Sequence, residues 1–286
     1  MTIDIACVEC IINQSRRVAD AIHADSRLSR LLTDKVTVMS ESFSFNDSPP
    51  EAAADVYETM AVLADKTDLY DEVKAHSTEK AKTFMPGLRK RIDNSDRPLL
   101  TAVKVAVAGN VIDLAAEVSF DLDEELAKIF ETEFSHNDFA VLESALKEAK
   151  TLLYIGDNVG EHLFDYLTIE TLQHLYPALH ITYMVRGNPI INDVTMKEAK
   201  EAGFEELCDL MDSGVNTPGF VYERANTQSQ NLFDEADLVI TKGMGNYECL
   251  SPSPRKNLAY LLKVKCNVVA RSLGREVGDI ICKMAT

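Results

Sequence analysis

The segment Thr151-Leu152-Leu153-Tyr154-Ile155-Gly156-Asp157-Asn158-Val159-Gly160-Glu161 joins a short apolar run to a polar loop that contains two glycines. An apolar run of this length, followed by an amphipathic stretch, predicts a buried strand that leads into a helix. The same pattern recurs along the chain at Ile181–Val185, Leu238–Thr241 and Tyr260–Val264, with a weaker candidate near Leu207–Met211. Strands that alternate with helices favour βαβ units and a parallel sheet.

The chain before residue 150 has a helical pattern instead. Apolar residues recur at helical spacing near the N-terminus, and residues 51–64 are rich in helix formers and follow Pro49-Pro50. Further helices are predicted over about 70–92, 98–118 and 136–149, the last capped by Ser135. We therefore expect a helical domain over residues 1–150 and an α/β domain over residues 151–286. No glycine- or serine-rich linker separates them, so we expect close packing.

The composition excludes several classes of protein. The 286 residues include 29 Lys and Arg against 46 Asp and Glu, for a net charge of −17. Binding to nucleic acid needs clustered basic residues, so no nucleic-acid partner is expected. No apolar run reaches the length of about 18 residues that a membrane-spanning helix needs, and no secretory signal is visible, so we expect a cytoplasmic protein without a membrane partner.

The cysteines leave two interpretations open. Of the six, Cys7 and Cys10 form the one C-x-x-C pair, and no second pair follows to complete a zinc site. The pair begins a helical segment, so its spacing places both thiols on one helical face. Packing thiols are one interpretation, and a metal or redox role is the other.

Polar residues follow the predicted strands, and the carboxyl ends of parallel strands are where ligands bind. Asp157, Asn158 and Asp193 supply hard oxygen donors, which suit Mg²⁺ or Mn²⁺. Glycines at 156, 160, 187, 243 and 245 would let backbone N–H groups approach an anion, and Lys242 and Lys265 add positive charge. Cation ligands beside anion-binding groups are what a phosphoryl-transfer site needs, although Asp and Asn after a strand are also common turn formers.

Other known sites are disfavoured. Gly243-x-Gly245 lacks the third glycine of a dinucleotide fingerprint, and neither a G-x-S-x-G elbow nor a G-x-x-x-x-G-K-[ST] loop occurs.

In the helical half, Gly109-Asn110-Val111-Ile112-Asp113 interrupts an apolar stretch. One interpretation is structural: Asn110 and Asp113 cap a helix or form hydrogen bonds between the domains. The other is functional: they belong to a helix that closes a pocket over the sheet.

Taken together, these motifs resemble the damage-control phosphatase family, also known as domain of unknown function 89 and including ARMT-like proteins. The C-x-x-C pair points to the branch common in archaea. The likeness runs through almost the whole chain in motif order, and it is carried by Cys7-x-x-Cys10, Gly109-Asn110-x-Ile112-Asp113, Gly156-Asp157-Asn158-x-Gly160-Glu161, Asn188-Pro189-Ile190-x-Asn192-Asp193-x-Thr195, Lys242-Gly243-Met244-Gly245-Asn246-Tyr247-Glu248 and Lys263-x-Lys265-Cys266.

The resemblance implies a Rossmann-like α/β/α domain with a mostly parallel sheet, preceded by an α-helical domain. It also implies a metal-dependent phosphatase that repairs metabolite damage by hydrolysing small phosphorylated metabolites such as sugar phosphates. Asp157, Asn158 and Asp193 would hold the divalent metal, Mg²⁺ or Mn²⁺, with Co²⁺ and Ni²⁺ as further candidates. The substrate contacts expected are Glu161, Lys242, Gly243, Met244, Gly245, Asn246 and Asn110.

Two residues are expected to act on the reacting group. Lys265 would offset charge on the phosphoryl oxygens, and the attacking oxygen would come from Asp157 or from a metal-activated water. The alternative function is a non-catalytic sensor that binds a phosphorylated metabolite, and a third is a redox or zinc module built on Cys7 and Cys10. The sequence does not indicate the oligomeric state.

Overall fold

The strands form a mostly parallel sheet, as the alternation of apolar runs predicts. The computed structural model describes residues 1–108 and 130–285. Within them a seven-stranded sheet has the order β1-β7-β6-β5-β2-β3-β4, and every neighbouring pair is parallel except β6 and β7. The strands are β1 (Phe134–Asn137), β2 (Thr151–Ile155), β3 (His180–Val185), β4 (Asp209–Asp212), β5 (Leu238–Lys242), β6 (Leu258–Lys263) and β7 (Ile280–Met284).

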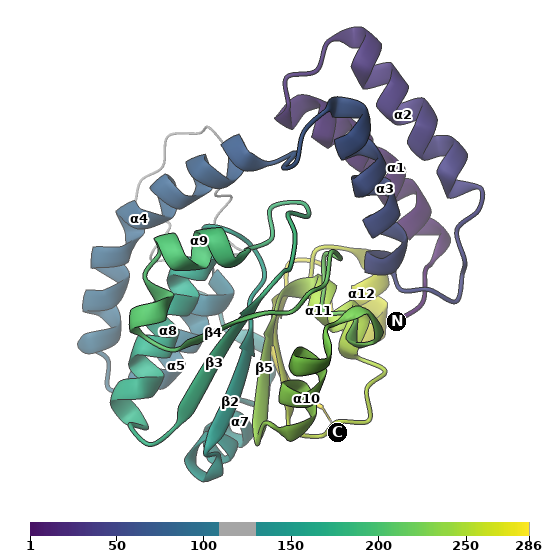
Figure 1. Cartoon of the computed structure of the whole chain (residues 1–286). Coiled ribbons are helices and arrows are strands. Elements are labelled where there is room, and N and C mark those ends of the chain that lie inside the picture. The colour runs from purple at the N-terminus through teal and green to yellow at the C-terminus, as the bar shows by residue number, and fades with distance from the viewer. Residues whose placement is uncertain (109–129, 286) are drawn as a thin grey trace.

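Helices cover both faces of this sheet, which makes three layers (Figure 1). One face packs against α5 (Pro98–Ala108), α7 (Phe139–Glu148) and α8 (Glu161–Leu175). The other packs against α10 (Thr227–Glu235), α11 (Gly243–Leu250) and α12 (Asn267–Leu273). The central strands are buried on both sides because successive side chains of a strand point to opposite faces, and both helical layers need apolar partners.

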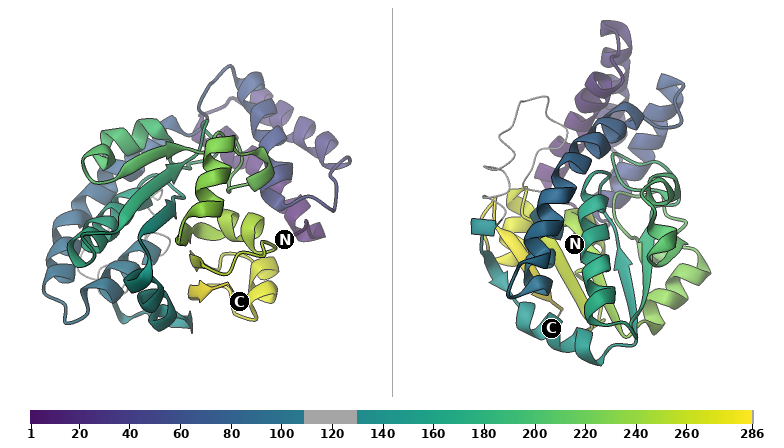
Figure 2. Two further views of the ribbon diagram at one scale, coloured as in Figure 1. Left: turned by 60° about the horizontal axis from the view of Figure 1, so that its bottom comes forward. Right: turned by 90° about the vertical axis from the view of Figure 1, so that its left-hand side faces the viewer.

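A second group of helices lies beyond the sheet. It contains α1 (Ile5–Ala21), α2 (Ser26–Ser40) and α3 (Pro49–Ala64), which share a hydrophobic cluster. Asp4 caps α1 by accepting a bond from the N–H of Ala6 at 2.9 Å. The views agree that this group stands at one end of the molecule, above α11 and α12 (Figures 1 and 2).

The remaining elements connect these layers. The long helix α4 (Asp71–Asp93) packs on α5 and α8. The short helix α9 (Met196–Glu201) and the 3₁₀ turns η1 (Phe204–Glu206) and η2 (Tyr222–Arg224) connect the later strands. Within the described ranges, no helix is long and apolar enough to cross a membrane.

The observed elements match the predicted α/β fold and correct some details. The helices predicted over 51–64 and 70–92 are α3 and α4, and the strand candidate near Leu207–Met211 is β4. The predicted cap Ser135 is wrong: it lies in β1, and Asp138 precedes α7. Residues 109–118 of the helix predicted over 98–118 lie outside the described part. The domain division at residue 150 stays a prediction. Four elements that precede residue 150 in the sequence belong to the sheet or pack with its helical layers, and they are α4, α5, β1 and α7.

Candidate active site

A cavity of about 810 Å³ opens where the parallel strands end. The loops that follow β2, β3 and β6 form one wall, and α1 and α3 form the opposite wall. Asp157, Asn158 and Asp193 line it together with Glu161 and Lys265. Strand ends converge at the rim of a parallel sheet, so residues far apart in sequence meet in one place. The volume is within the usual range for a small-molecule site.

The loops after β2 and β3 bond to each other and hold the three oxygen donors in place. The N–H of Val194 donates to the carbonyl of Asp157 at 2.8 Å, and Asn158 pairs with Asp193 in an isolated antiparallel bridge. The side-chain nitrogen of Asn158 donates to Oδ2 of Asp157 at 2.8 Å and to Oε1 of Glu161 at 3.0 Å. The oxygen of that amide therefore remains as the atom that can bind a cation.

Arg186 lies behind these carboxylates with 1% of its surface exposed. Its Nε donates to Oδ2 of Asp193 at 2.8 Å, and its Nη2 lies 3.9 Å from Oδ1 of Asp157. Nη2 also donates to Oδ1 of Asn246 at 3.2 Å. Among the described residues, Nη1 has no hydrogen-bond partner. This arginine therefore fixes both carboxylates from the side of the core.

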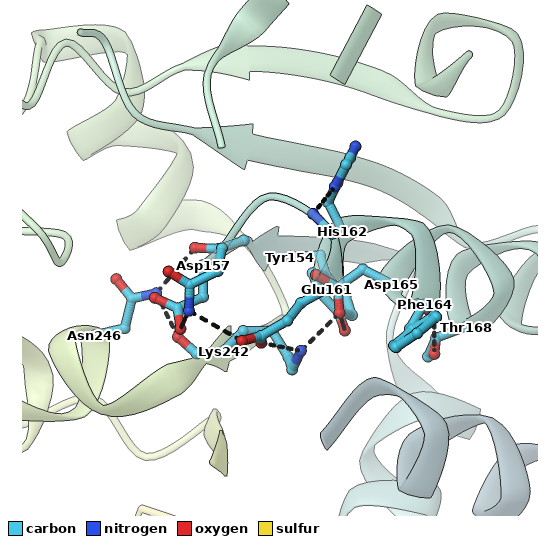
Figure 3. A network of polar contacts seen from close by, with 12 residues as sticks. Tyr154, Asp157, Glu161, His162, Phe164, Asp165, Thr168, Lys242 and Asn246 are labelled. Carbon is cyan, nitrogen blue, oxygen red and sulfur yellow. Dashed lines mark hydrogen bonds and ion pairs between the residues drawn. The ribbon is translucent and has the colours of Figure 1, made fainter. Parts of the chain in front are cut away.

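A second buried cation lies behind Glu161. Lys242 is fully buried; its Nζ donates to Oδ1 of Asp165 at 2.9 Å and lies 3.9 Å from Oε2 of Glu161. Tyr154 also donates to Oδ1 of Asp165, at 2.7 Å. Figure 3 shows Lys242 between the two acidic side chains. Opposite charges and hydrogen bonds compensate each buried group here, which is the condition for burying them stably.

The first turn of α11 comes very close to Asp157. Gly243 begins this helix at φ +78°, and a Cβ atom there would lie 1.9 Å from Oδ2 of Asp157. A Cβ on Gly245 would lie 1.8 Å from the carbonyl oxygen of Pro218. Both positions thus require glycine. Gly245 and the intervening Met244 line the cavity.

Burial raises the pKa of each site carboxyl group. The pKa of Asp157 rises to about 6 through burial and then through Asp193, against the opposing charges of Arg186 and Lys265. Burial likewise raises the pKa of Asp193 to about 6, although Arg186 opposes it. The pKa of Glu161 rises to about 7 through burial, against Lys265 and Lys242. The nearby cations Arg186, Lys242 and Lys265 do not fully compensate the burial of this acidic cluster.

This donor set fits a hard divalent cation. Within the described residues, no three His, Cys, Asp or Glu side chains converge in a way that could hold a metal ion by themselves. Two carboxylates and an amide oxygen do suit Mg²⁺, because this ion keeps several waters and takes one or two carboxylates together with substrate phosphate. A bound cation would also stabilise the charged forms of Asp157 and Asp193, whose pKa values burial raises.

The remaining predicted residues occupy different positions. Lys265 lines the cavity beside Met244, whose sulfur accepts a bond from the Lys265 N–H at 3.1 Å. Lys242 and Asn246 are fully buried behind the cavity wall and do not line it. Asn246 donates to the carbonyl oxygens of Gly156 and Lys242, and so ties α11 to the loop after β2. Asn110 and its neighbours lie outside the described residues.

Several residues in or behind the cavity wall were not predicted from sequence. Arg186 directly follows β3, and a charged residue between an apolar run and a glycine is the signal that could have identified it. Glu248 also lines the cavity, and burial raises its pKa to about 7. Cys7 and Cys10 line the opposite wall, so they lie in the same cavity as Asp157 despite their distance in sequence. Their thiols are free.

Comparisons with known proteins agree over the whole chain. A family model described as the damage-control phosphatase ARMT1-like domain matches residues 3–281. The chain is 30% identical to a damage-control phosphatase of Archaeoglobus fulgidus, over 99% of both proteins. It is 31% identical to a damage-control phosphatase of Pyrococcus horikoshii, over 99% of this chain and 98% of that protein. The crystal structure of a DUF89 family protein from Pyrococcus horikoshii superposes with a TM-score of 0.93 at 29% identity and covers 100% of both chains.

Proposed function

This chain belongs to the ARMT1-like damage-control phosphatase family, and we propose that it hydrolyses phosphate monoesters of small metabolites in a reaction that requires a divalent metal ion. The observation that carries the proposal is the pair of buried carboxylates, Asp157 and Asp193, in a cavity that also contains Lys265. Acidic groups for a cation and a basic group for an anion, side by side, suit the binding of a phosphoryl group.

Asp157, Asn158 and Asp193 would hold the metal, Mg²⁺ or Mn²⁺. When bound, such an ion would neutralise charge on the phosphoryl oxygens and orient the ester for attack. Arg186 keeps the Asp193 carboxylate in one orientation through its bond at 2.8 Å. Asn158 does the same for Asp157, so the donors are positioned before any ligand arrives.

The substrate phosphate would be bound by groups on the neighbouring strand ends. Lys265 supplies a positive charge at the cavity wall, and the backbone of Met244 and Gly245 lies beside it in the first turn of α11. A donor aimed at the charge that develops during phosphoryl transfer is often worth about 10²–10³-fold in rate. Lys242 and Asn246 act through Glu161 and Gly156, so we assign them positioning roles.

The test is hydrolysis of p-nitrophenyl phosphate and a panel of sugar phosphates before and after metal removal. We expect a chelator to abolish turnover and Mg²⁺, Mn²⁺, Co²⁺ or Ni²⁺ to restore it. Asp193→Asn should lose the metal-dependent activity, while it keeps an oxygen that accepts the Arg186 bond. Asp212→Asn is the matched control, because Asp212 also ends a strand but is exposed and lies outside the cavity lining.

Two outcomes would refute the proposal. Undiminished turnover after exhaustive chelation, or in Asp193→Asn, would show that these carboxylates hold no essential metal. Tight binding of sugar phosphates without any hydrolysis in the presence of metal would favour the sensor function instead. A thermal melt of each variant separates loss of the site from loss of the fold.

A further inference from the structure

The cavity extends well beyond the carboxylates, to a wall formed by α1 and α3. Six α1 residues line this part of the cavity, and each lies three or four positions from another, as expected for one helical face. The six are Ala6, Cys7, Cys10, Ile11, Gln14 and Arg17. A phosphate ester bound at Asp157 would therefore present its non-phosphate part to this face. This face is therefore the place to look for groups that would recognise that part of the substrate.

Gln14 has a defined orientation on this wall. The hydroxyl of Tyr57 donates to Oε1 of Gln14 at 3.1 Å, and Tyr57 is only 3% exposed. Because Oε1 accepts this bond, the amide N–H groups are the ones left to meet a ligand. Nε2 lies 4.0 Å from the sulfur of Cys10, a weak contact that a hydroxyl-bearing ligand can replace.

Arg17 is the cation of this wall. It is exposed, and it forms no ion pair with any described residue, although the protein has 46 acidic against 29 basic residues. Arg17 lines the same cavity as Tyr57 and Gln14. The other cations of the cavity, Lys263 and Lys265, come from the strand end on the opposite wall.

We propose that Arg17 determines substrate specificity by binding a second anionic group at the end of the substrate remote from the ester. The proposal rests on the proposed phosphatase function. A guanidinium presents a rigid fork of N–H donors that matches a carboxylate or a phosphate. The substrate class is therefore a small, hydroxylated phosphate monoester that also carries a distal carboxylate or second phosphate.

The experiment compares three substrates of nearly the same size: glucose 6-phosphate, 6-phosphogluconate and glucose 1,6-bisphosphate. kcat/KM is measured for each with metal present, and Kd is measured by calorimetry for the phosphonate analogues in which a methylene replaces the ester oxygen. We expect the protein to prefer the two doubly anionic compounds at least tenfold. Arg17→Gln should remove most of this preference, because kcat/KM for the two doubly anionic compounds should fall much further than the value for glucose 6-phosphate.

Arg16→Gln is the matched control, since Arg16 is the neighbouring exposed arginine on α1 but does not line the cavity. It should retain the preference. Arg17→Lys, which keeps the charge without the fork, should fall between the two. No preference in the unaltered protein, or an unchanged preference in Arg17→Gln, would overturn the proposal. An Arg17-dependent difference in Kd without hydrolysis of any ester would instead overturn the phosphatase function and leave the anion site standing.

Discussion

Replacing Gly243 by alanine should damage the site far more than the fold. Gly243 adopts φ +78°, a conformation in which an alanine is strained by about 1–2 kcal/mol. The new Cβ would also lie 1.9 Å from Oδ2 and 2.3 Å from Cγ of Asp157, whereas ordinary contacts begin at 3.4 Å. The difference, 3.4 − 1.9, means that the carboxylate or the first turn of α11 must shift by about 1.5 Å.

The shift falls on Asp157, which holds its position through the 2.8 Å bond from Asn158. A displacement of 1 Å at a catalytic group can cost about 10²-fold in rate. We therefore expect kcat for p-nitrophenyl phosphate to fall at least about 100-fold in Gly243→Ala. The side chain can rotate away, so the fold should lose little beyond the backbone strain.

Gly203→Ala provides the control for that strain. Gly203 has φ +83°, and nothing lies within 4 Å of a Cβ placed there. Urea denaturation should show a similar loss of stability, about 1–2 kcal/mol, in both variants. Gly203→Ala should keep kcat within twofold. If folded Gly243→Ala keeps more than a tenth of the activity, the position of Asp157 does not limit the reaction and the assignment is wrong.

Two further predictions concern single side chains. Lys265→Met keeps the stem of the side chain and removes its charge, so turnover should fall about 10²–10³-fold with metal affinity preserved. The control, Lys256→Met at an exposed site, should behave as wild type. A fully active Lys265→Met would place Lys265 off the reaction path. His162 is buried, and burial lowers its pKa from 6.5 to about 4. Its neutral form contributes stability above pH 6.5 that is lost as the pH falls towards 4. In urea denaturation over this pH range, the free energy of unfolding of the wild type should therefore fall by up to about 3 kcal/mol more than that of His162→Asn. Equal losses in the two proteins would refute the shifted pKa.

The central strands could be predicted because their apolar runs are continuous and buried on both faces. β1 and β7 were not predicted, for different reasons. The sequence of β1, Phe134–Asn137, has one buried residue and so carries almost no strand signal. The sequence of β7, Ile280–Met284, is apolar, but it follows β6 in the sheet as an antiparallel neighbour, which a pattern of repeated βαβ units does not predict.

The residues of the site divide in the same way, into those that a local sequence pattern indicates and those that only a long-range contact brings into place. Asp157, Asp193 and Lys265 could be proposed because each follows a strand, and parallel strand ends converge. The wall that contains Arg17 and Cys7 could not be proposed, since its position depends on how α1 packs against the rest of the chain. That contact is long-range, and no local periodicity encodes it. Both interpretations of Cys7 and Cys10, as packing thiols or as a metal or redox pair, stay predictions, and the two residues line the same cavity as Asp157.

The arrangement of charges predicts that activity and stability are coupled in this protein. Buried cations lie behind carboxylates that we assign to the site: Arg186 supports Asp193, and Lys242 lies near Glu161. Removing one partner of a buried pair leaves the other charge uncompensated, at a cost of about 3–5 kcal/mol. An alanine at Asp193 would therefore lower stability as well as activity, and the two effects could not be separated. Asp193→Asn also removes the charge that a metal needs, but it keeps the side-chain shape and an oxygen that accepts the Arg186 bond, and Asp157 still lies 3.9 Å from the guanidinium. It should therefore cost less stability than alanine, so the chemistry of the site can be measured in a folded protein.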